Sequence, residues 1–225
     1  MILVLNNKSN FSLNEFNSYI NNLSKIENKS SIVLCPSSCF IPLCYECGMS
    51  IGSQDVSSSD SLAYTGEITA RQLKSLNVKY CIVGHADRGE DANTISSKIR
   101  MLFNNDILPI LCVGEKQKTE DLDEVKQEVL NKINSVMKNF NDSLKDKIII
   151  AYEPIWAVNS DIIIDSNNTR EILMFIKNAF PNNKLLYGGG VNVDNYHSLC
   201  NVNELDGFLL GRLGNDIDTL CDMID

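Results

Sequence analysis

The sequence predicts an α/β fold, a single-domain (β/α)8 barrel over residues 1–225. Eight short apolar runs alternate with longer amphipathic runs along the whole chain. Most of the apolar runs are continuous and rich in valine, isoleucine and leucine, as strands covered on both faces must be. Alternation of strand and helix implies a parallel sheet, and eight such units is the number that closes a barrel of this kind.

The eight apolar runs follow one another from the first residue onward and are read as strands. They span residues 1–6, 31–37, 49–54, 78–84, 107–114, 147–153, 184–189 and 206–211. Chemistry in such a barrel is located at the carboxyl ends of the strands, so these boundaries indicate where to look for functional residues.

Between the strands, apolar residues recur at helical spacing. The expected helices span residues 13–26, 68–77, 92–105, 119–140, 168–180, 192–200 and 215–224. Ser12 is a candidate N-cap for the first helix. The segment 38–47, "SCFIPLCYEC", has the least clear pattern. A doubly wound open sheet is the structural alternative, but it usually has fewer strands and often a glycine-rich turn after the first, and "LNNKSNF" (5–11) has no glycine.

Composition and charge exclude several classes of function. The 225 residues are 44% hydrophobic, enough for one sizeable core. The net charge of −9 and the pI of about 4.8, with no block of lysine and arginine, argue against binding to nucleic acid or to an anionic membrane. No apolar run approaches the roughly 20 residues of a membrane span. The start "MILVLNNKSN" lacks the features of a signal peptide, so we expect a cytoplasmic protein.

The eight cysteines include one Cys-X-X-Cys pair, Cys44 and Cys47, which raises the question of a metal or redox site. A structural zinc site needs four ligands, and the chain has only two histidines and no second pair of this kind. We therefore expect reduced thiols distributed through a cytosolic fold.

Three strands end in residues suited to acid–base chemistry. Lys8 follows the first strand and would place a cation at the barrel mouth, unless it is an ordinary exposed loop lysine. His85 follows a glycine at the end of the fourth strand, where a short helical turn would favour a neutral imidazole. Glu153 ends the sixth strand, and a carboxylate at an apolar edge suits a general base. Pro154 and Trp156 follow it as the stiff hinge of a moving lid would.

The seventh and eighth strands end in glycines, in "YGGGVN" (187–192) and "LLGRLG" (209–214). Glycine lets backbone N–H groups approach an anion closely, and the loops after these two strands are the usual phosphate site of this architecture. Tight turns alone would also explain them. A cation, an imidazole, a carboxylate and a phosphate cradle together suggest proton abstraction next to a carbonyl on a small phosphorylated sugar.

Six motifs, in order along nearly the whole chain, carry a resemblance to a known family. They are "AYTGEI" (63–68), "VGHADR" (83–88), "CVGE" (112–115), "AYEPIWA" (151–157), "YGGGVN" (187–192) and "DGFLLG" (206–211). With these motifs the chain resembles the triosephosphate isomerase family. The resemblance implies an aldose–ketose isomerase of glycolysis and gluconeogenesis, which interconverts dihydroxyacetone phosphate and D-glyceraldehyde 3-phosphate.

The resemblance also implies roles for individual residues. Glu153 would be the base that moves a proton between two carbons. His85 would polarise the carbonyl and shuttle protons, and Lys8 would stabilise negative charge. Asn6 would position substrate, and residues 154–164 would form a lid. No metal or organic cofactor is implied.

The loop around Thr65 resembles the one that family members insert into a partner subunit, so a homodimer is expected.

The sequence departs from the family pattern mostly at the phosphate end. The lid tip reads Asn159-Ser160-Asp161 in place of Gly-Thr-Gly, although the N–H of Asn159 could still reach phosphate. Gly190 replaces a serine and keeps its N–H. Arg212 replaces the second glycine after the eighth strand, beside Gly211, and could supply a compensating charge or point outward. Asp87 replaces a glutamate, which leaves its coupling to Lys8 open.

Two other functions compete with that of an active isomerase. The altered lid would fit a non-catalytic phosphosugar-binding or scaffolding barrel, but such a protein needs no base, and Lys8, His85 and Glu153 are all retained. A phosphosugar aldolase would need a Schiff-base lysine inside the barrel, where only Lys8 is near. We therefore expect the isomerase.

Overall fold

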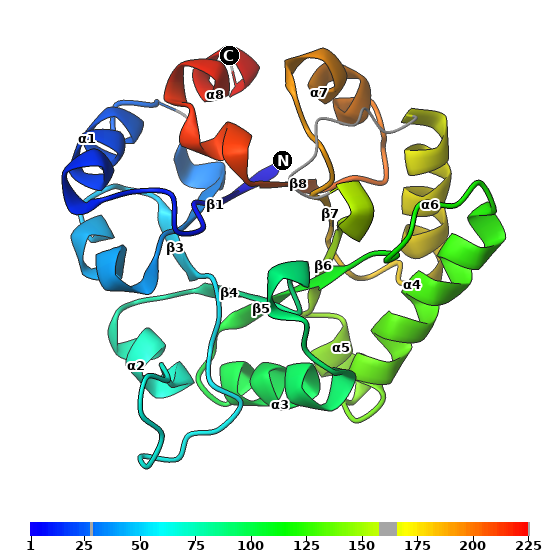
Figure 1. The fold of residues 1–225 in the computed structure, drawn as a ribbon, viewed down its shortest axis with the longest axis horizontal. Coiled ribbons are helices and arrows are strands. Elements are labelled where there is room, and N and C mark those ends of the chain that lie inside the picture. Colours follow the sequence, from blue (N-terminus) through cyan, green and yellow to red (C-terminus); the bar gives the residue numbers. More distant parts are fainter. Residues whose placement is uncertain (28, 158–165, 225) are drawn as a thin grey trace.

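The computed structural model describes residues 1–27, 29–157 and 166–224, and within them it confirms the expected (β/α)8 barrel. Eight parallel strands pair in sequence order, and the last closes on the first (Figure 1). The strands are β1 (Ile2–Asn6), β2 (Ile32–Cys35), β3 (Ser50–Ser53), β4 (Tyr80–Val83), β5 (Leu108–Val113), β6 (Ile149–Tyr152), β7 (Leu185–Tyr187) and β8 (Gly207–Leu210).

Helices surround the barrel, as Figure 1 shows. The α-helices are α1 (Leu13–Leu23), α2 (Ala70–Ser75), α3 (Ala92–Phe103), α4 (Leu122–Met137), α5 (Asp142–Lys145), α6 (Ser166–Ala179), α7 (Val193–Cys200) and α8 (Ile217–Ile224). Short 3-10 helices are η1 (Lys29–Ser31), η2 (Ser38–Cys44), η3 (Ala86–Arg88), η4 (Ile155–Ala157) and η5 (Arg212–Asn215). Four of these, η2, η3, η4 and η5, closely follow the ends of strands, and the last three do so where the site residues are expected.

The core has two layers, because side chains alternate along each strand. Every second residue points into the barrel, and these residues are Val4, Val33, Cys35, Ile82, Ile110, Cys112, Ile149, Ala151, Leu186 and Leu209. The intervening residues, such as Leu3 and Leu5 of β1, pack outward against the helices. A filled interior makes the barrel a rigid platform for its loops, and replacing one such leucine with alanine costs about 2–5 kcal/mol.

Local structure differs from expectation in two segments. The ambiguous segment 38–47 forms η2, whose Pro42 removes one backbone donor and is compatible with this short tight turn. The helix α5 was not expected. It is a single turn in which the side chain of Asn141 accepts a hydrogen bond from the N–H of Leu144 at 3.0 Å.

The expected cap of α1 is present as a hydrogen bond from the N–H of Ser12 to the Glu15 carboxylate at 2.8 Å. The helices in the described parts of the chain are too short or too polar to traverse a lipid bilayer.

Candidate active site

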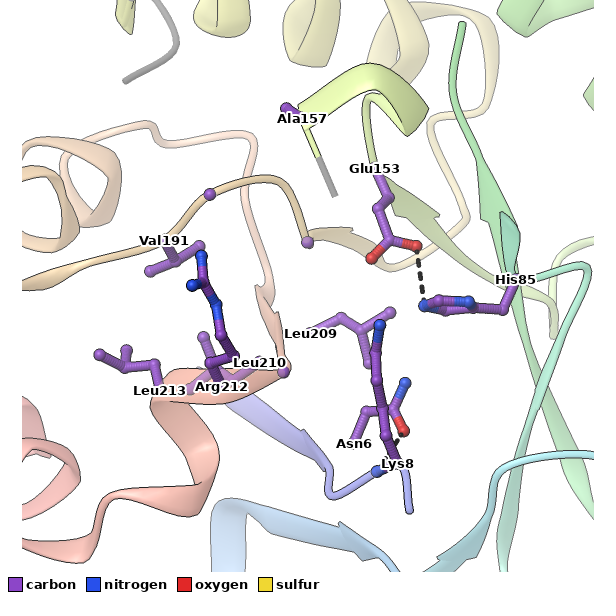
Figure 2. A pocket seen from close by; sticks show the side chains of 13 residues that line it. Asn6, Lys8, His85, Glu153, Ala157, Val191, Leu209, Leu210, Arg212 and Leu213 are labelled. Carbon is purple, nitrogen blue, oxygen red and sulfur yellow. Dashed lines mark hydrogen bonds and ion pairs between the residues drawn. The ribbon is translucent and has the colours of Figure 1, made fainter. Parts of the chain in front are cut away.

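A pocket lies at the carboxyl ends of the strands, over the mouth of the barrel. Residues from the ends of β1, β4, β6, β7 and β8 line it (Figure 2). They are Asn6, Lys8, His85, Glu153, Ala157, Gly188, Gly190, Val191, Leu209, Leu210, Gly211, Arg212 and Leu213. Segments more than 200 positions apart in the sequence therefore meet at one small cavity, because the closed barrel brings all eight strand ends to the same rim.

The backbone of Glu153 is fixed by the neighbouring strand. Its N–H donates to the carbonyl of Val113 at 2.7 Å, continuing the pairing of β5 with β6. Gly114 lies so close that a Cβ atom there would come within 1.9 Å of the Glu153 carbonyl oxygen. The carboxylate is buried and faces the pocket rather than bulk solvent. Only glycine at position 114 permits this approach of the two strand ends.

His85 faces Glu153 across the pocket. Its Nδ1 accepts a hydrogen bond from the backbone N–H of Asp87 at 3.2 Å, at the start of η3. An imidazole nitrogen that accepts carries no proton, so the neutral ring has its proton on Nε2. That Nε2 lies 3.4 Å from Oε2 of Glu153, as the dashed line in Figure 2 shows.

The contact between these two atoms is close but is not a formed hydrogen bond. Oε2 of Glu153 and Nε2 of His85 are both buried, and within the described residues neither has a hydrogen-bond partner. Buried polar atoms normally have partners. Two such atoms on the wall of one pocket are available to bind a polar ligand.

Lys8 has a strained backbone that its neighbours hold in place. Its φ is +50°, a left-handed conformation that residues other than glycine rarely adopt. Its carbonyl accepts hydrogen bonds from Ser37 Oγ and from Gln54 Nε2, each at 2.8 Å. Its N–H donates to Oδ1 of Asn6 at 3.2 Å. Backbone strain of this kind persists only where the surroundings fix the conformation, and here it fixes the origin of the side chain.

The ammonium group of Lys8 pairs with Asp87, which settles the question that the sequence left open. Nζ of Lys8 lies 3.0 Å from Oδ2 of Asp87, so the shorter carboxylate still reaches it. Partial burial alone would raise the pKa of Asp87, but the hydrogen bond from Lys8 and the nearby His85 lower that pKa overall. Asp87 is therefore a carboxylate at neutral pH, and Lys8 keeps a fixed counter-ion beside the pocket.

The ends of β7 and β8 form the opposite wall. Gly190 has a φ of +55°, which favours glycine, and its carbonyl accepts a hydrogen bond from Nδ2 of Asn195 at 2.9 Å. Arg212 begins η5 and lines the pocket, and Figure 2 shows its side chain extending beside Val191. Arg212 is exposed and lines the pocket, so its charge lies at this wall.

Glu115 is a functional residue that the sequence analysis did not single out. Its buried carboxylate accepts hydrogen bonds from Nε1 of Trp156 at 2.6 Å and from the Tyr152 hydroxyl at 3.1 Å. Its carbonyl accepts from the N–H of Ile155 at 3.0 Å. These bonds hold η4, the beginning of the expected lid. The signal was present in the motif "CVGE", which matched the family but was given no role.

The structure brings together all the predicted site residues that it describes. Asn6, Lys8, His85, Glu153, Gly190, Gly211 and Arg212 line the same pocket. Asn159, and with it the outer part of the expected lid, lies outside the described residues.

The cysteines form no disulfide in the part of the chain that the structure describes, and among the same residues no three or more His, Cys, Asp or Glu side chains are grouped to hold a metal ion. Burial raises the pKa of Cys44 to about 12 and also raises that of Cys47. Neither is a reactive thiolate at neutral pH.

The arrangement is suited to moving protons on a small polar molecule. A buried carboxylate can take a proton, an Nε2–H can donate to an oxygen, and an ammonium can stabilise negative charge, all within one cavity. The glycine-containing ends of β7 and β8, with Arg212, can bind an anionic group at the other end of that molecule.

Comparison with known proteins gives a consistent result. A family profile described as triosephosphate isomerase matches residues 1–225. Triosephosphate isomerase of Orientia tsutsugamushi (strain Ikeda) is 34% identical over 246 residues, which cover 99% of this chain and 96% of that protein. The enzyme of Wolbachia sp. subsp. Brugia malayi is 31% identical over 222 residues, covering 96% of this chain and 93% of that protein. The enzyme of Dictyoglomus thermophilum is 30% identical over 206 residues, covering 84% and 83%.

Proposed function

The chain belongs to the triosephosphate isomerase family, and we propose that Glu153, His85 and Lys8 carry out its interconversion of dihydroxyacetone phosphate and D-glyceraldehyde 3-phosphate. The observation that supports these roles most strongly is the 3.4 Å approach of Glu153 Oε2 to His85 Nε2 in a pocket that Lys8 also lines. Substrate placed between them would contact all three groups.

Glu153 takes the proton from the carbon next to the carbonyl. The electron pair of that C–H bond forms a carbon–carbon double bond, and negative charge develops on the former carbonyl oxygen. Protonated Glu153 then returns a proton to the neighbouring carbon, which completes the exchange of aldose for ketose. A buried base whose Oε2 accepts no hydrogen bond within the described residues can approach either carbon with little rearrangement.

His85 and Lys8 stabilise the enediolate. The Nε2–H of His85 donates to the oxygen that becomes negative, and the same ring can pass a proton between the two oxygens. The Lys8 ammonium adds a positive charge that the pair with Asp87 holds in position. Asn6 fixes the backbone of Lys8 through the hydrogen bond described above and positions substrate beside it.

The phosphate group binds at the ends of β7 and β8. Gly190 and Gly211 have no side chain that would block the approach of the phosphate group to their backbone. Arg212 supplies a planar, permanently charged donor. We further propose that the backbone N–H of Asn159 binds the phosphate group. Residues 154–164 would form the lid.

Membership of the family also guides our proposals on the assembly and the location of the protein. We propose a homodimer formed through the loop around Thr65, in which Leu62 and Tyr64 are exposed apolar residues. We also propose that the chain is one barrel domain acting in cytoplasmic glycolysis and gluconeogenesis, on a small phosphorylated substrate, without nucleic acid or membrane partners and without a metal or organic cofactor.

A coupled assay on the purified full-length protein tests the catalytic roles. Glu153→Gln, His85→Gln and Lys8→Met should each lower kcat/KM by about 10²–10⁴-fold, the range expected for loss of a positioned proton-transfer or charge-stabilising group. Glu171→Gln, a matched change of an exposed glutamate on α6, should leave the rate unchanged. Wild-type rates in Glu153→Gln would contradict the proposal.

A further inference from the structure

A second cleft lies on the other side of the loop that carries His85. It is bounded by α3, by α4, and by the segments that follow β4 and β5. It encloses about 740 Å³, within the range of about 300–1,000 Å³ that is usual for small-molecule sites. His85 lines both this cleft and the active-site pocket, so a molecule bound here would contact the loop of the catalytic imidazole.

The cleft combines an apolar wall with lysine side chains. Its apolar lining is Ala86, Ala92, Ile95, Val136 and Ile155. Lys116 and Lys132 are its cationic residues. Each carboxylate of the cleft has a partner, although the buried Oε2 of Glu90 accepts no hydrogen bond within the described residues. Glu128 accepts a hydrogen bond from the backbone N–H of Lys116 at 3.3 Å, and Glu90 pairs with Lys98 of α3.

Lys132 projects from α4 into this cleft and is the unusual group in it. Its side chain is partly buried, and within the described residues it makes no hydrogen bond or ion pair. Burial lowers the pKa of Lys132, and the positive charge of Lys116 adds to that effect. The negative charges of Glu153 and, one helical turn away, of Glu128 act in the opposite direction without outweighing burial.

The remaining titratable neighbours do not neutralise Lys132. Cys112 of β5 is a protonated thiol at neutral pH, because burial raises its pKa well above the ordinary value. His85 uses its Nδ1 for the N–H of Asp87, and Glu90 is paired as described. Lys132 is thus an amine with an increased neutral fraction at the wall of a partly apolar cleft.

We propose that Lys132 is a site of imine formation with small aldehydes that carry an anionic group. The neutral amine attacks the carbonyl carbon, and the resulting carbinolamine loses water to give a C=N bond to Lys132. Lys116 pairs with the anionic group, and the apolar wall limits the access of water that would reverse the reaction. In the cell, glyceraldehyde 3-phosphate is an aldehyde of this kind. Its identification as the natural reactant rests on the function proposed above.

Pyridoxal 5′-phosphate is a suitable probe, because it is an anionic aldehyde that the isomerase reaction does not consume. The full-length protein is incubated with it at neutral pH and reduced with sodium borohydride, and the labelled lysines are identified by peptide mass spectrometry. Lys138, exposed at the carboxyl end of the same helix, serves as the internal comparison. Label at Lys132 should exceed label at Lys138 roughly fivefold or more, since the neutral amine is the nucleophile. Equal or weaker label at Lys132 would overturn the proposal.

Two further measurements test the chemistry and the preference for an anion. The ratio of label at Lys132 to label at Lys138 should rise as the pH falls from about 11 to about 8, because the amine with the lower pKa loses less of its neutral form. Pyridoxal, which lacks the phosphate, should label Lys132 less than pyridoxal 5′-phosphate does, and Lys116→Gln should remove that difference. A constant ratio would contradict the reactive amine, and equal labelling by both probes in the unaltered protein would contradict the anionic class. Neither measurement depends on isomerase activity, so a failure here is separate from a failure of the catalytic proposal.

Discussion

At the scale of single residues, the account rests on two buried atoms that face each other without a formed hydrogen bond. Oε2 of Glu153 and Nε2 of His85 are 3.4 Å apart in the pocket. A base locked in a salt bridge would have to lose that partner before it could take a proton. In this site the ammonium of Lys8 pairs with Asp87 instead, and the Oε2 of Glu153 has only the close contact with His85, which is not a formed hydrogen bond.

Arg212 gives a test at the phosphate end. Arg212→Leu should raise KM for glyceraldehyde 3-phosphate about 10–100-fold with a smaller effect on kcat, because a charged hydrogen bond contributes about 1.5–3 kcal/mol. It should weaken competitive inhibition by inorganic phosphate to a similar degree. Steady-state kinetics measure both.

The matched control is Arg71→Leu, which removes an exposed arginine from α2. Unchanged KM and phosphate inhibition in Arg212→Leu would mean that this side chain does not contact the substrate.

Residue types at strand ends were enough to predict that Lys8, His85 and Glu153 meet at one pocket, because each is a chemically distinctive group after an apolar run. The pairing of Lys8 with Asp87 could not be predicted. It depends on a 3.0 Å contact between residues 79 positions apart, and on the left-handed backbone of Lys8. The role of Glu115 was missed for a related reason: its partners Tyr152 and Trp156 lie on the next strand and turn, and only the folded chain places them around it.

At the scale of elements, η4 is the point at which a rigid barrel strand passes into the proposed lid. Glu115 receives hydrogen bonds from both sides of this junction, from Tyr152 at the end of β6 and from Trp156 in η4. Gly189 packs against Pro154 so closely that a Cβ atom there would lie 2.6 Å from the proline ring. The end of β7 and the start of the lid are therefore in direct contact.

The Glu115 contact predicts a pH dependence that the single tryptophan of the chain can report. Burial raises the pKa of Glu115 above its ordinary 4.5, although the bonds from Trp156 and Tyr152 partly oppose this. Trp156 fluorescence should therefore titrate with a midpoint above 4.5, and Glu115→Gln should abolish that titration. Because the pKa is raised on folding, this group favours the folded state below pH 4.5, and the contribution is lost as the pH rises through the raised pKa. A midpoint below 4.5 would contradict the burial argument.

Gly114 sets the spacing between β5 and β6 at the active site. Gly114→Ala should lower the free energy of unfolding by about 3 kcal/mol or more, because its Cβ would overlap the Glu153 carbonyl oxygen at 1.9 Å. Urea denaturation followed by circular dichroism measures the change. Gln117→Ala, at an exposed position three residues further on, is the control. A loss no larger than that of the control would show that the two strand ends can separate without cost.

The strands were predictable because continuous apolar runs flanked by polar residues are distinctive, whereas helix ends depend on competing caps. The pattern of α4 extends back to residue 119, yet the helix starts at Leu122, because the Asp121 side chain accepts bonds from the N–H groups of Asp123 and Glu124. The single turn α5 is too short to show a period, and its Asn141 cap is as common in loops as in helices.

At the scale of the whole molecule, one loop extends beyond the ring of helices. Between β3 and α2 the chain projects outward, as Figure 1 shows in cyan, and residues 60–67 are all exposed. Within it Leu62 is 83% exposed and Tyr64 59%. Apolar side chains presented this way are typical of a surface that a partner covers.

The dimer proposal predicts that this loop controls assembly. The unaltered 25.1 kDa chain should sediment as a dimer, and Leu62→Asp should shift it toward the monomer, because a buried carboxylate without a partner opposes association. Met174→Asp, which alters an exposed apolar residue on α6, should leave the dimer intact. Analytical ultracentrifugation distinguishes these outcomes. A loop variant that remains fully dimeric would place the interface elsewhere.

The closure of eight strands into one ring is what brings Lys8, His85 and Glu153 to one pocket, where we propose that they act on one molecule. Isomerisation of glyceraldehyde 3-phosphate in D2O, followed by NMR, tests this most directly. If Glu153 moves the proton, solvent deuterium should enter the carbon-bound position of the product, and Glu153→Gln should lose both isomerisation and exchange. Product formed at the wild-type rate by Glu153→Gln, or free of deuterium in the unaltered enzyme, would contradict the account.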